Sequence, residues 1–427
     1  MGSIEELLER RYRVIGRNSP LFYAKPLHLV RGEGVWLWDA DGKRYLDAYN
    51  NVPHVGHCHP RVVEVIAKQA ATLNTSTRYL HEGIVRYAER LTATFDPSLS
   101  MAMLVCTGSE ANELALRISN VMTGGKGVIC TNFAYHGNTS AVAQIGTVFP
   151  PPEGFGPHIR AIAPPDTYRG LRGLSGQALE DAYVDEVRKA IESFEAGKIK
   201  LAAMLICTVY SSEGLPNVPP NYMRRVVDLV HKAGGLYIAD EVQGGFSRTG
   251  HHMWGHKTYG VIPDLVTMGK PMGNGHPIGG VVGRADLVQG FTDRAMYFNT
   301  FAGNPVSCAA ANAVLDVLKD ERLMENAVTV GDYMVAGLNR LAAKYPSIGE
   351  VRGKGMFFAA ELVKDRGTKE PDGAEAKRII NAMRDRGVLI SRIGPHDSVL
   401  KIRPPMVFTK EHADLLLKTL DEVLAAR

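Results

Sequence analysis

Two apolar, strand-like runs in this chain end on side chains that could do chemistry together. Leu236–Ala239 is followed by Asp240, and Leu265–Met268 is followed, after one glycine, by Lys270. If the two runs are neighbouring parallel strands, a buried carboxylate and a buried amine can face one heterocyclic ring. An amine in that position can attack a carbonyl group, and a carboxylate can keep a ring nitrogen protonated.

This pair of residues meets the needs of pyridoxal phosphate. Lys270 would form the Schiff base with the aldehyde of the cofactor, and Asp240 would hold its ring nitrogen protonated so that the ring accepts electrons. Spacing alone leaves another interpretation open, because aspartates and lysines at strand ends also cap or solvate ordinary loops.

A phosphate site is expected where a strand-like run ends at Cys106 and a helix begins. Gly108 permits close approach of the backbone, and the N–H groups of Ser109 and Glu110 point out of the helix start towards any bound anion. The alternative is an ordinary capped helix, with Thr107 or Ser109 as the cap and nothing bound.

Further segments offer weaker signals for the same site. Tyr135 and His136 follow the next strand-like run, and the tyrosine could stack on a planar ring. Gln243 could reach a ring hydroxyl group, and Thr300 offers a hydroxyl group before the turn at Gly303. Each of these residues is equally compatible with packing or with a loop.

The stretch Gly56–Pro60, which reads Gly-His-Cys-His-Pro, invites a metal interpretation that we do not adopt. Short-spaced His and Cys ligands rarely complete a tetrahedral site, and the chain has no Cys-x-x-Cys pair to add. We expect no metal, and instead a turn that Pro60 rigidifies, with its histidines bonded to the backbone. His252 and His256 have helical ligand spacing, but they are expected in a loop.

The composition excludes several classes of protein. The 427 residues, 45% of them hydrophobic, exceed the size at which one core stops growing, so two lobes are expected. The 49 basic and 45 acidic residues are well mixed, which argues against nucleic-acid binding. The five cysteines are odd in number and far apart, which fits a reducing cytoplasm. No apolar run is long enough to span a membrane.

Strand-like and helical patterns alternate through the middle of the chain, which predicts an α/β fold with a mainly parallel sheet between helices. The strand-like runs are 101–106, 127–130, 159–163, 201–207, 236–239, 265–268 and 280–283, and the helical segments between them include 109–122, 178–196 and 222–233. We expect a large cofactor-binding domain over residues 61–310. Residues 311–427 should form a smaller α+β domain, with one long amphipathic stretch from 305 to 341 leading into it. Residues 1–60 should pack with that domain through a hairpin at Asp41-Gly42.

Taken in order, these segments resemble the class III (omega-type) aminotransferases, a family of pyridoxal-phosphate enzymes of fold type I. The resemblance runs from about Val35 to Leu424 and implies a large domain built on a seven-stranded sheet. It also implies a homodimer with shared active sites, which could pair further into a tetramer. The residues matching the cofactor site of the family are Lys270, Asp240, Gly108, Ser109, Tyr135, Val242, Gln243 and Thr300, the last of which would reach the cofactor phosphate of the neighbouring subunit.

A narrower resemblance links the chain to the branch that contains ethanolamine-phosphate phospho-lyase. It is carried by the segments 50–60, 74–81 and 400–406. Lys401 stands where many members of the family carry an arginine that clamps a substrate carboxylate, and Thr208 stands where the family usually has a glutamate near the substrate. A lysine supplies a point charge without the bidentate fork of arginine.

Two reactions follow from these resemblances. The leading expectation is transamination, in which Lys270 relays the proton while an amino group passes from a primary amine or ω-amino acid to a keto acid or aldehyde. The alternative is elimination of phosphate and ammonia from an amino-alcohol phosphate such as ethanolamine phosphate. Cations that could hold such a phosphate are Arg78, Lys401 and Arg403.

Overall fold

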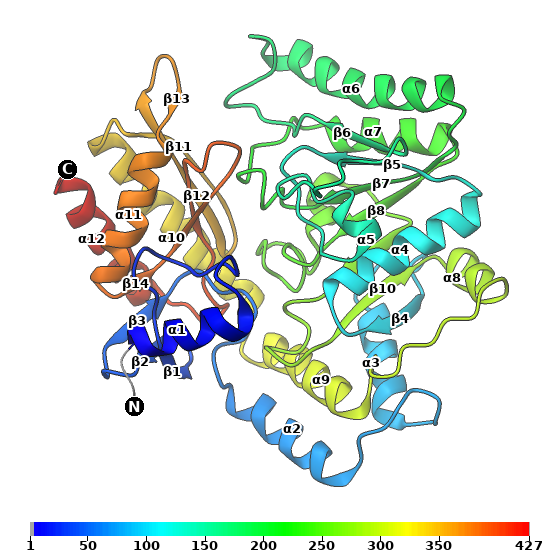
Figure 1. Ribbon diagram of the computed structural model, residues 1–427, viewed down its shortest axis with the longest axis horizontal. Helices are drawn as coiled ribbons and strands as arrows, with labels where there is room; N and C mark the ends of the chain where they lie inside the picture. The colour runs from blue at the N-terminus through cyan, green and yellow to red at the C-terminus, as the bar shows by residue number, and fades with distance from the viewer. Residues whose placement is uncertain (1–3, 427) are drawn as a thin grey trace.

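The computed structural model describes residues 4–426 and has two lobes (Figure 1). The large lobe is built on a seven-stranded sheet with strand order β4-β10-β9-β8-β7-β5-β6. Every neighbouring pair is parallel except the two made by β10, which runs antiparallel to β4 and β9. The strands are β4 (Met101–Val105), β5 (Gly127–Thr131), β6 (Ile159–Ile162), β7 (Leu201–Cys207), β8 (Leu236–Asp240), β9 (Leu265–Met268) and β10 (Gly279–Gly283). The predicted fold class is confirmed.

Helices cover both faces of this sheet because its central strands are apolar on both sides. In β8, Leu236 and Ile238 join one hydrophobic cluster, while Tyr237 and Ala239 join another. The first cluster also takes in α4 (Gly108–Thr123) and α8 (Ala285–Thr292), and the second takes in α6 (Gly176–Ala196) and α7 (Tyr222–Lys232). Alternation along a strand places successive side chains on opposite faces, so this burial requires a sheet between two helical layers.

The small lobe contains two further sheets and three helices. One sheet has the order β1-β2-β3-β14 and the other has the order β11-β12-β16-β15, with β13 paired to β12. Its elements are β1 (Leu29–Glu33), β2 (Trp36–Asp39), β3 (Arg44–Asp47), α10 (Leu323–Lys344), β11 (Ile348–Lys354), β12 (Phe357–Asp365), β13 (Glu370–Pro371), α11 (Gly373–Asp385), β14 (Val388–Leu389), β15 (Ser391–Ile393), β16 (Val399–Ile402) and α12 (Lys410–Ala425).

The early and late parts of the chain meet in one sheet of the small lobe. β2 and β3 form the expected antiparallel hairpin, with Trp36 opposite Leu46. β3 also pairs in parallel with β14, which aligns Leu46 with Val388. Residues that precede the large lobe in the sequence and residues that follow it therefore build the small lobe together. The exact domain boundaries stay a prediction.

The amphipathic stretch 305–341, expected to be one long element, is two helices. α9 (Pro305–Asp320) ends before Arg322, which has a left-handed backbone with φ of 52°, and α10 begins at Leu323. A left-handed residue redirects the chain, so α9 packs in the large lobe while α10 packs in the small one.

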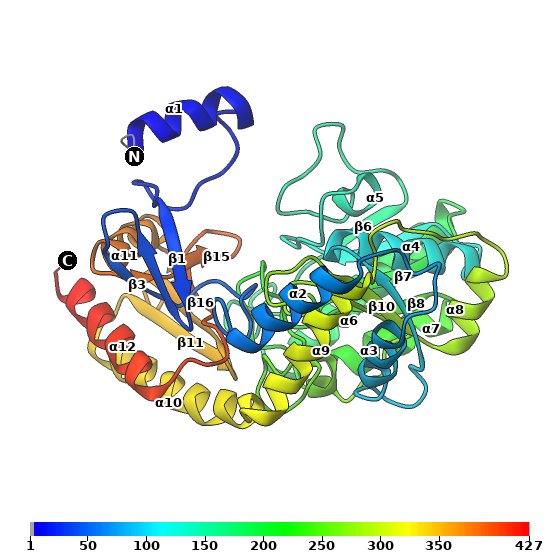
Figure 2. The same ribbon diagram turned by 90° about the horizontal axis from the view of Figure 1, so that it is seen from below.

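Four further α-helices and one 3-10 helix (Gly255–Tyr259) complete the described chain. α2 (Pro60–Thr72) and α3 (Glu82–Thr92) lie beside α9, and α5 (Ser140–Ala143) lies next to α4. α1 (Ile4–Ile15) buries none of its residues and stands away from the small lobe in Figure 2.

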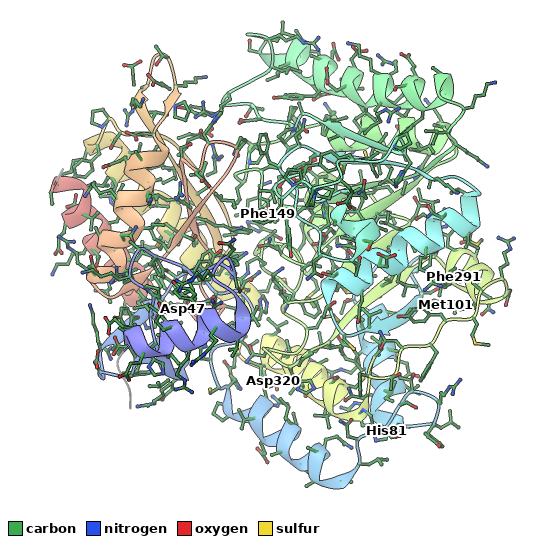
Figure 3. The ribbon with its side chains drawn as sticks, in the orientation of Figure 1. Asp47, His81, Met101, Phe149, Phe291 and Asp320 are labelled. Carbon is green, nitrogen blue, oxygen red and sulfur yellow. The ribbon has the colours of Figure 1, made fainter. Side chains whose placement is uncertain are left out.

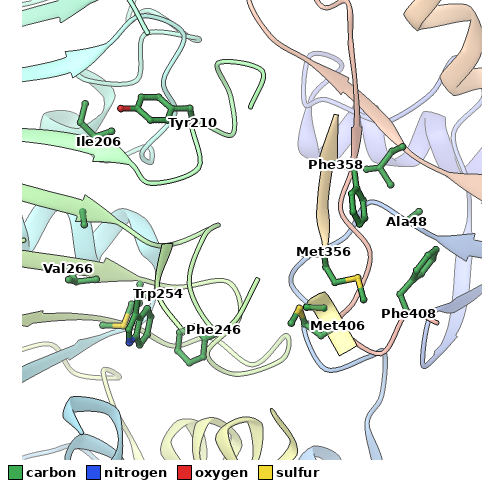
Figure 4. Close-up of a cluster of buried hydrophobic side chains, with 14 of the residues drawn as sticks. Ala48, Ile206, Tyr210, Phe246, Trp254, Val266, Met356, Phe358, Met406 and Phe408 are labelled. Carbon is green, nitrogen blue, oxygen red and sulfur yellow. The ribbon is translucent and has the colours of Figure 1, made fainter. Parts of the chain in front are cut away.

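The two lobes share one hydrophobic core. Figure 4 shows Phe246 and Trp254 of the large lobe on one side, and Met356, Phe358 and Met406 of the small lobe on the other. Within residues 4–426, no helix combines the length and the apolar composition needed to cross a membrane.

Candidate active site

A cavity of about 280 Å³ opens at the carboxyl ends of β8 and β9. Asp240 is the last residue of β8, and Lys270 lies two residues beyond the end of β9, so both side chains line it. The segments 106–109, 135–137 and 275–278 provide much of the remaining wall, and Val52 reaches in from the N-terminal segment. The strand-end position predicted from spacing thus brings the carboxylate and the amine to one cavity.

The Asp240 carboxylate is held by three donors. Its Oδ2 accepts from His136 Nδ1 at 2.6 Å and from Asn112 Nδ2 at 3.1 Å, and its Oδ1 accepts from the Val242 backbone N–H at 3.0 Å. All of these groups are buried. These donors fix the orientation of the carboxylate, which is the group that would pair with a protonated ring nitrogen.

Burial and a neighbouring cation lower the pKa of Lys270. Removal from water is the larger cause, the positive charge of Arg403 is the second, and the negative charge of Asp240 opposes them. A lysine with a lowered pKa carries a larger neutral fraction near neutral pH. Lys270 is therefore suited to act as a nucleophile and as a proton acceptor.

The start of α4 combines a helix cap with an open cradle. Thr107 is the cap and accepts from the Glu110 N–H at 3.1 Å, so the predicted capping is present while Gly108 and Ser109 still line the cavity. A Cβ on Gly108 would lie 2.9 Å from Val242 Cγ2. A Cβ on Gly137 would lie 2.5 Å from Ser109 Oγ. Only glycine fits at both positions, which keeps backbone exposed where a phosphate would approach.

The remaining predicted cofactor residues divide into two groups. Tyr135, His136, Val242 and Gln243 all line the cavity. The Tyr135 ring meets the ring of Phe149, labelled in Figure 3, edge-on at 5.9 Å. Thr300 is exposed and lies outside the cavity of its own chain.

Among the predicted substrate cations, Lys401 and Arg403 are buried and Arg78 is exposed. Lys401 Nζ donates to the Ser211 carbonyl at 3.1 Å, and Arg403 donates to the Tyr49 carbonyl at 3.1 Å and to the Gln243 side-chain oxygen. The pKa of Lys401 is held well below its ordinary value, first by burial and then by the charge of Arg403, with a further lowering from Lys270. Lys401 and Arg403 therefore lie close enough to Lys270 for their charges to interact, but neither is among the residues that line the cavity.

Arg78 lies elsewhere. Its guanidinium group stacks 4.3 Å from the centre of the Phe298 ring, two residues before Thr300. The structure therefore groups Arg78 with Thr300 on the exterior, and not with the cavity of its own chain.

Thr208 does not occupy the position near the substrate that the resemblance suggested. Its hydroxyl donates to Glu241 Oε2 at 2.9 Å, and it lines a separate small cavity. Glu213, in the loop after β7, is a second buried carboxylate near His136, and it accepts from Thr131 at 2.6 Å. Burial raises the pKa of Glu213, and the charge of His136 opposes the rise. Sequence reasoning missed Glu213 because the loop after β7 gives no periodic signal.

The histidines of the Gly56–Pro60 turn bind carboxylates, not the backbone as expected. His57 Nε2 lies 2.6 Å from Asp47 Oδ2, and His59 Nε2 lies 2.9 Å from Glu321 Oε1. A carboxylate is a stronger partner than a carbonyl for an imidazole N–H. Pro60 begins α2, and within residues 4–426 no cluster of three or more His, Cys, Asp and Glu side chains could hold a metal ion.

Asn112 and Thr267 were not singled out from the sequence. The Asn112 amide bonds Asp240, and Thr267 Oγ1 donates to Asn112 Oδ1 at 2.6 Å. One signal could have identified Asn112, because it lies four residues after Gly108 and so shares a helix face with the cradle.

These features fit pyridoxal phosphate. Gly108 and Gly137 leave backbone exposed at the expected phosphate site, where a Cβ at either position would clash. Lys270, whose pKa is lowered, lines the same cavity as Asp240, whose carboxylate accepts three hydrogen bonds. In addition, His136 Nε2 is buried without a hydrogen-bond partner in the described protein. A buried polar atom of that kind calls for a partner.

Comparisons with known proteins agree with this site. The class III aminotransferase model matches residues 22–424. An alanine–glyoxylate aminotransferase 2-like protein of Drosophila melanogaster is 42% identical, over 99% of this chain and 87% of its own. The ethanolamine-phosphate phospho-lyase homolog 1 of Caenorhabditis elegans is 38% identical, over 99% of this chain and 94% of its own.

Solved structures give the same result. A phospholyase from Arthrobacter in complex with phosphoethanolamine is 49% identical with a TM-score of 0.96, covering 99% of this chain and all of that one. An (S)-enantioselective omega-transaminase from Thermomicrobium roseum is 30% identical with a TM-score of 0.87, covering 100% and 99%. The family and the cofactor expected from the sequence are confirmed: this chain belongs to the class III aminotransferases and is a pyridoxal-phosphate-dependent enzyme.

Proposed function

We propose that this enzyme eliminates phosphate from a small amino-alcohol phosphate, of which ethanolamine phosphate is the simplest. The observation that carries the proposal is that two basic side chains, Lys401 and Arg403, are buried near Lys270. The hydrogen bonds that the structure gives them go to neutral acceptors. An anion bound beside Arg403 would compensate its buried positive charge, and it would also favour protonation of Lys401, whose pKa burial lowers.

A phosphate dianion suits this pair better than a single carboxylate does. When the anion favours the protonated form of Lys401, two positive charges match the two negative ones, and a lysine and an arginine are common ligands of phosphate. The 49% identical Arthrobacter protein, described as a phospholyase with phosphoethanolamine, supports the same substrate class.

The residues of the chain would divide the work as follows. When bound, pyridoxal phosphate supplies an electron sink for the carbon next to the amine. Lys270 accepts the proton from that carbon, and Asp240 keeps a negative charge beside the ring nitrogen. Lys401 and Arg403 hold the phosphate group and stabilise its charge as the C–O bond breaks.

Transamination, the leading expectation from the sequence, is the second candidate. The 42% identical Drosophila relative is named as an aminotransferase, and Lys401 could also hold the carboxylate of a keto acid. The two reactions use Lys270 and Asp240 alike and differ in whether the neighbouring carbon carries a leaving group.

One experiment separates the two reactions. Holoenzyme is mixed with ethanolamine phosphate or with a panel of amines, without any keto acid, while free phosphate and the visible spectrum are followed. Phosphate released over many turnovers supports elimination. Conversion of the cofactor to its aminated form without phosphate release shows transamination and rejects our proposal.

A matched pair of variants locates the phosphate site. Lys401→Met should raise the KM for ethanolamine phosphate at least about tenfold, because a charge-assisted bond to the anion is lost. Lys364→Met removes an exposed lysine that is paired with Glu370, and should leave KM unchanged. Equal KM values in the two variants would exclude Lys401 from substrate binding.

We further propose a homodimer with shared active sites, which could pair into a tetramer. Large apolar side chains are exposed around Thr300, and we define the 80/301 face by Tyr79, Leu80, Met296, Phe298 and Phe301. Exposed apolar groupings mark protein interfaces. Thr300 lies within this face, which supports a role at the cofactor phosphate of a second copy. A cytoplasmic location stays a prediction, supported by five free cysteines.

A further inference from the structure

Asn112 connects the three elements that build the cofactor site. It belongs to α4, its amide nitrogen donates to Asp240 Oδ2 on β8 at 3.1 Å, and its amide oxygen accepts from Thr267 Oγ1 on β9 at 2.6 Å. The second amide hydrogen goes to the His136 carbonyl at 2.7 Å. Asn112 and Thr267 have no exposed surface.

Only one orientation of this amide satisfies its surroundings. If the amide were turned over, its oxygen would face the Asp240 carboxylate and the His136 carbonyl, which are both acceptors. The observed orientation points both N–H bonds at those acceptors, and the Thr267 hydroxyl supplies the donor that the oxygen needs.

The position of Asn112 in the helix links the two ends of the cofactor site. Gly108 and Asn112 are four residues apart on α4, which corresponds to a rise of about 6 Å along the helix axis. The same rigid element therefore presents the phosphate cradle at its first turn and the aspartate-binding amide one turn later.

We propose that Asn112, held in place by Thr267, is a positioning residue that orients the Asp240 carboxylate toward the ring nitrogen of the bound cofactor, so that the proton between them stays on the nitrogen. The proton between the ring nitrogen and Asp240 can lie on either partner. Each hydrogen bond that Asp240 accepts stabilises the carboxylate and so favours the proton on nitrogen. Loss of the Asn112 amide moves that proton towards Asp240, and this effect is independent of which reaction the enzyme catalyses.

The test reads the ring nitrogen directly in the holoenzyme without substrate. Enzyme loaded with cofactor labelled with ¹⁵N in the ring is compared by NMR for the native chain, Asn112→Leu, Thr267→Val and Thr267→Ser. The ¹⁵N signal should move towards the unprotonated form in Asn112→Leu. It should move part of the way in Thr267→Val, which keeps the side-chain size but frees the amide. Thr267→Ser keeps the hydroxyl and should restore the native signal.

A second readout separates positioning from simple structural damage. Exchange of the substrate α-proton with solvent should slow about tenfold or more in Asn112→Leu with KM nearly unchanged, because a charge-assisted hydrogen bond changes an equilibrium by at least that factor. Ser119→Ala is the matched control, since it removes another buried polar group of α4, bonded to the Ala115 carbonyl, and should change neither readout.

Two results would overturn the proposal. One is a native ¹⁵N signal in loaded Asn112→Leu. The other is a Thr267→Ser signal that matches Thr267→Val. If Asn112→Leu fails to fold, the two Thr267 variants decide the question alone. A native ¹⁵N signal in Thr267→Val would then show that the Thr267 hydroxyl is not needed to orient Asn112, and would reject the proposal.

Discussion

At the scale of single residues, Lys270 is expected to be indispensable. Lys270→Ala removes the only amine that residues 4–426 bring to the cavity wall, so the protein should bind cofactor without its characteristic visible absorbance and should lose activity by about a thousandfold or more. Visible spectra and initial rates measure both effects. Lys364→Met loaded with cofactor is the control. An unchanged visible spectrum in Lys270→Ala would reject Lys270 as the Schiff-base lysine.

Arg403 is expected to set the pH at which Lys270 becomes reactive. Its positive charge contributes to the lowered pKa of Lys270, so Arg403→Met should raise that pKa. The neutral amine then appears only at higher pH, and the midpoint for loading cofactor onto the apoenzyme should move up by about one pH unit. Loading rates across a pH series measure the midpoint, and a shift to lower pH would contradict the electrostatic argument.

The sequence was a good guide to residues at strand ends and a poor guide to contacts between elements. Asp240 and Lys270 could be predicted because each follows an apolar run that must be a buried strand. The partners of Asp240 come from α4 and from the loop after β5, and no local pattern brings those segments together. The neutral partners of Lys401 and Arg403 depend on how the two lobes meet, which spacing along the chain does not encode.

At the scale of elements, the start of α4 should tolerate no side chain at Gly108. In Gly108→Ala, the new Cβ would meet Val242, which lines the cavity. We expect the dissociation constant for pyridoxal phosphate to rise at least about tenfold, a loss of about 1.4 kcal/mol. Titration of apoenzyme measures it. Pyridoxal without phosphate is the control ligand, and it should lose less affinity because it does not use the cradle. Equal losses of affinity for the two ligands would show that Gly108 does not act through the phosphate site.

Among the elements, periodic patterns predicted the sheet strands, the hairpin and the helices α4, α6 and α7. They did not predict the break between α9 and α10. The residue that turns the chain there is Arg322 in a left-handed conformation, a position where glycine or asparagine would have been a signal. The helix breaks there because α9 packs against the large lobe and α10 against the small one. The amphipathic pattern continues across the break, so it gives no sign of it.

At the scale of the whole molecule, the 80/301 face should hold two copies together. Phe301→Arg combined with Leu80→Asp places charges on this apolar face, and we expect monomers with little activity because Thr300 no longer reaches a second site. Light scattering gives the mass. Leu415→Arg is the control, since it changes an exposed apolar residue of α12, and should leave the mass unchanged. A dimeric double variant with full activity would exclude this face.

Contacts between the lobes should make stability depend on pH through His54. Its Nε2 donates to the Phe246 carbonyl at 2.7 Å and its Nδ1 accepts from Arg248 at 3.0 Å. Burial, followed by the charge of Arg248, holds its pKa well below the ordinary 6.5. The unfolded chain therefore binds the proton first as pH falls, and the native state loses about 1.4 kcal/mol per pH unit below 6.5 from this group.

Urea unfolding at a series of pH values tests this expectation. His54→Gln removes the titrating group, so the difference in free energy of unfolding between the native chain and the variant should shrink as the solution becomes acidic. A difference that stays constant down to the acid limit would mean that His54 does not titrate on unfolding.

The parallel pairing of β3 with β14 has a consequence for how the molecule is made. Leu46 cannot meet Val388 until the ribosome has synthesised everything between them, which includes the whole of the large lobe. The edge of β3 in the hairpin therefore stays unpaired while the seven-stranded sheet assembles. Unpaired strand edges can hydrogen-bond to strands of other chains. Nascent copies held at high concentration should be most prone to aggregate during this interval, before the last strand closes the small lobe.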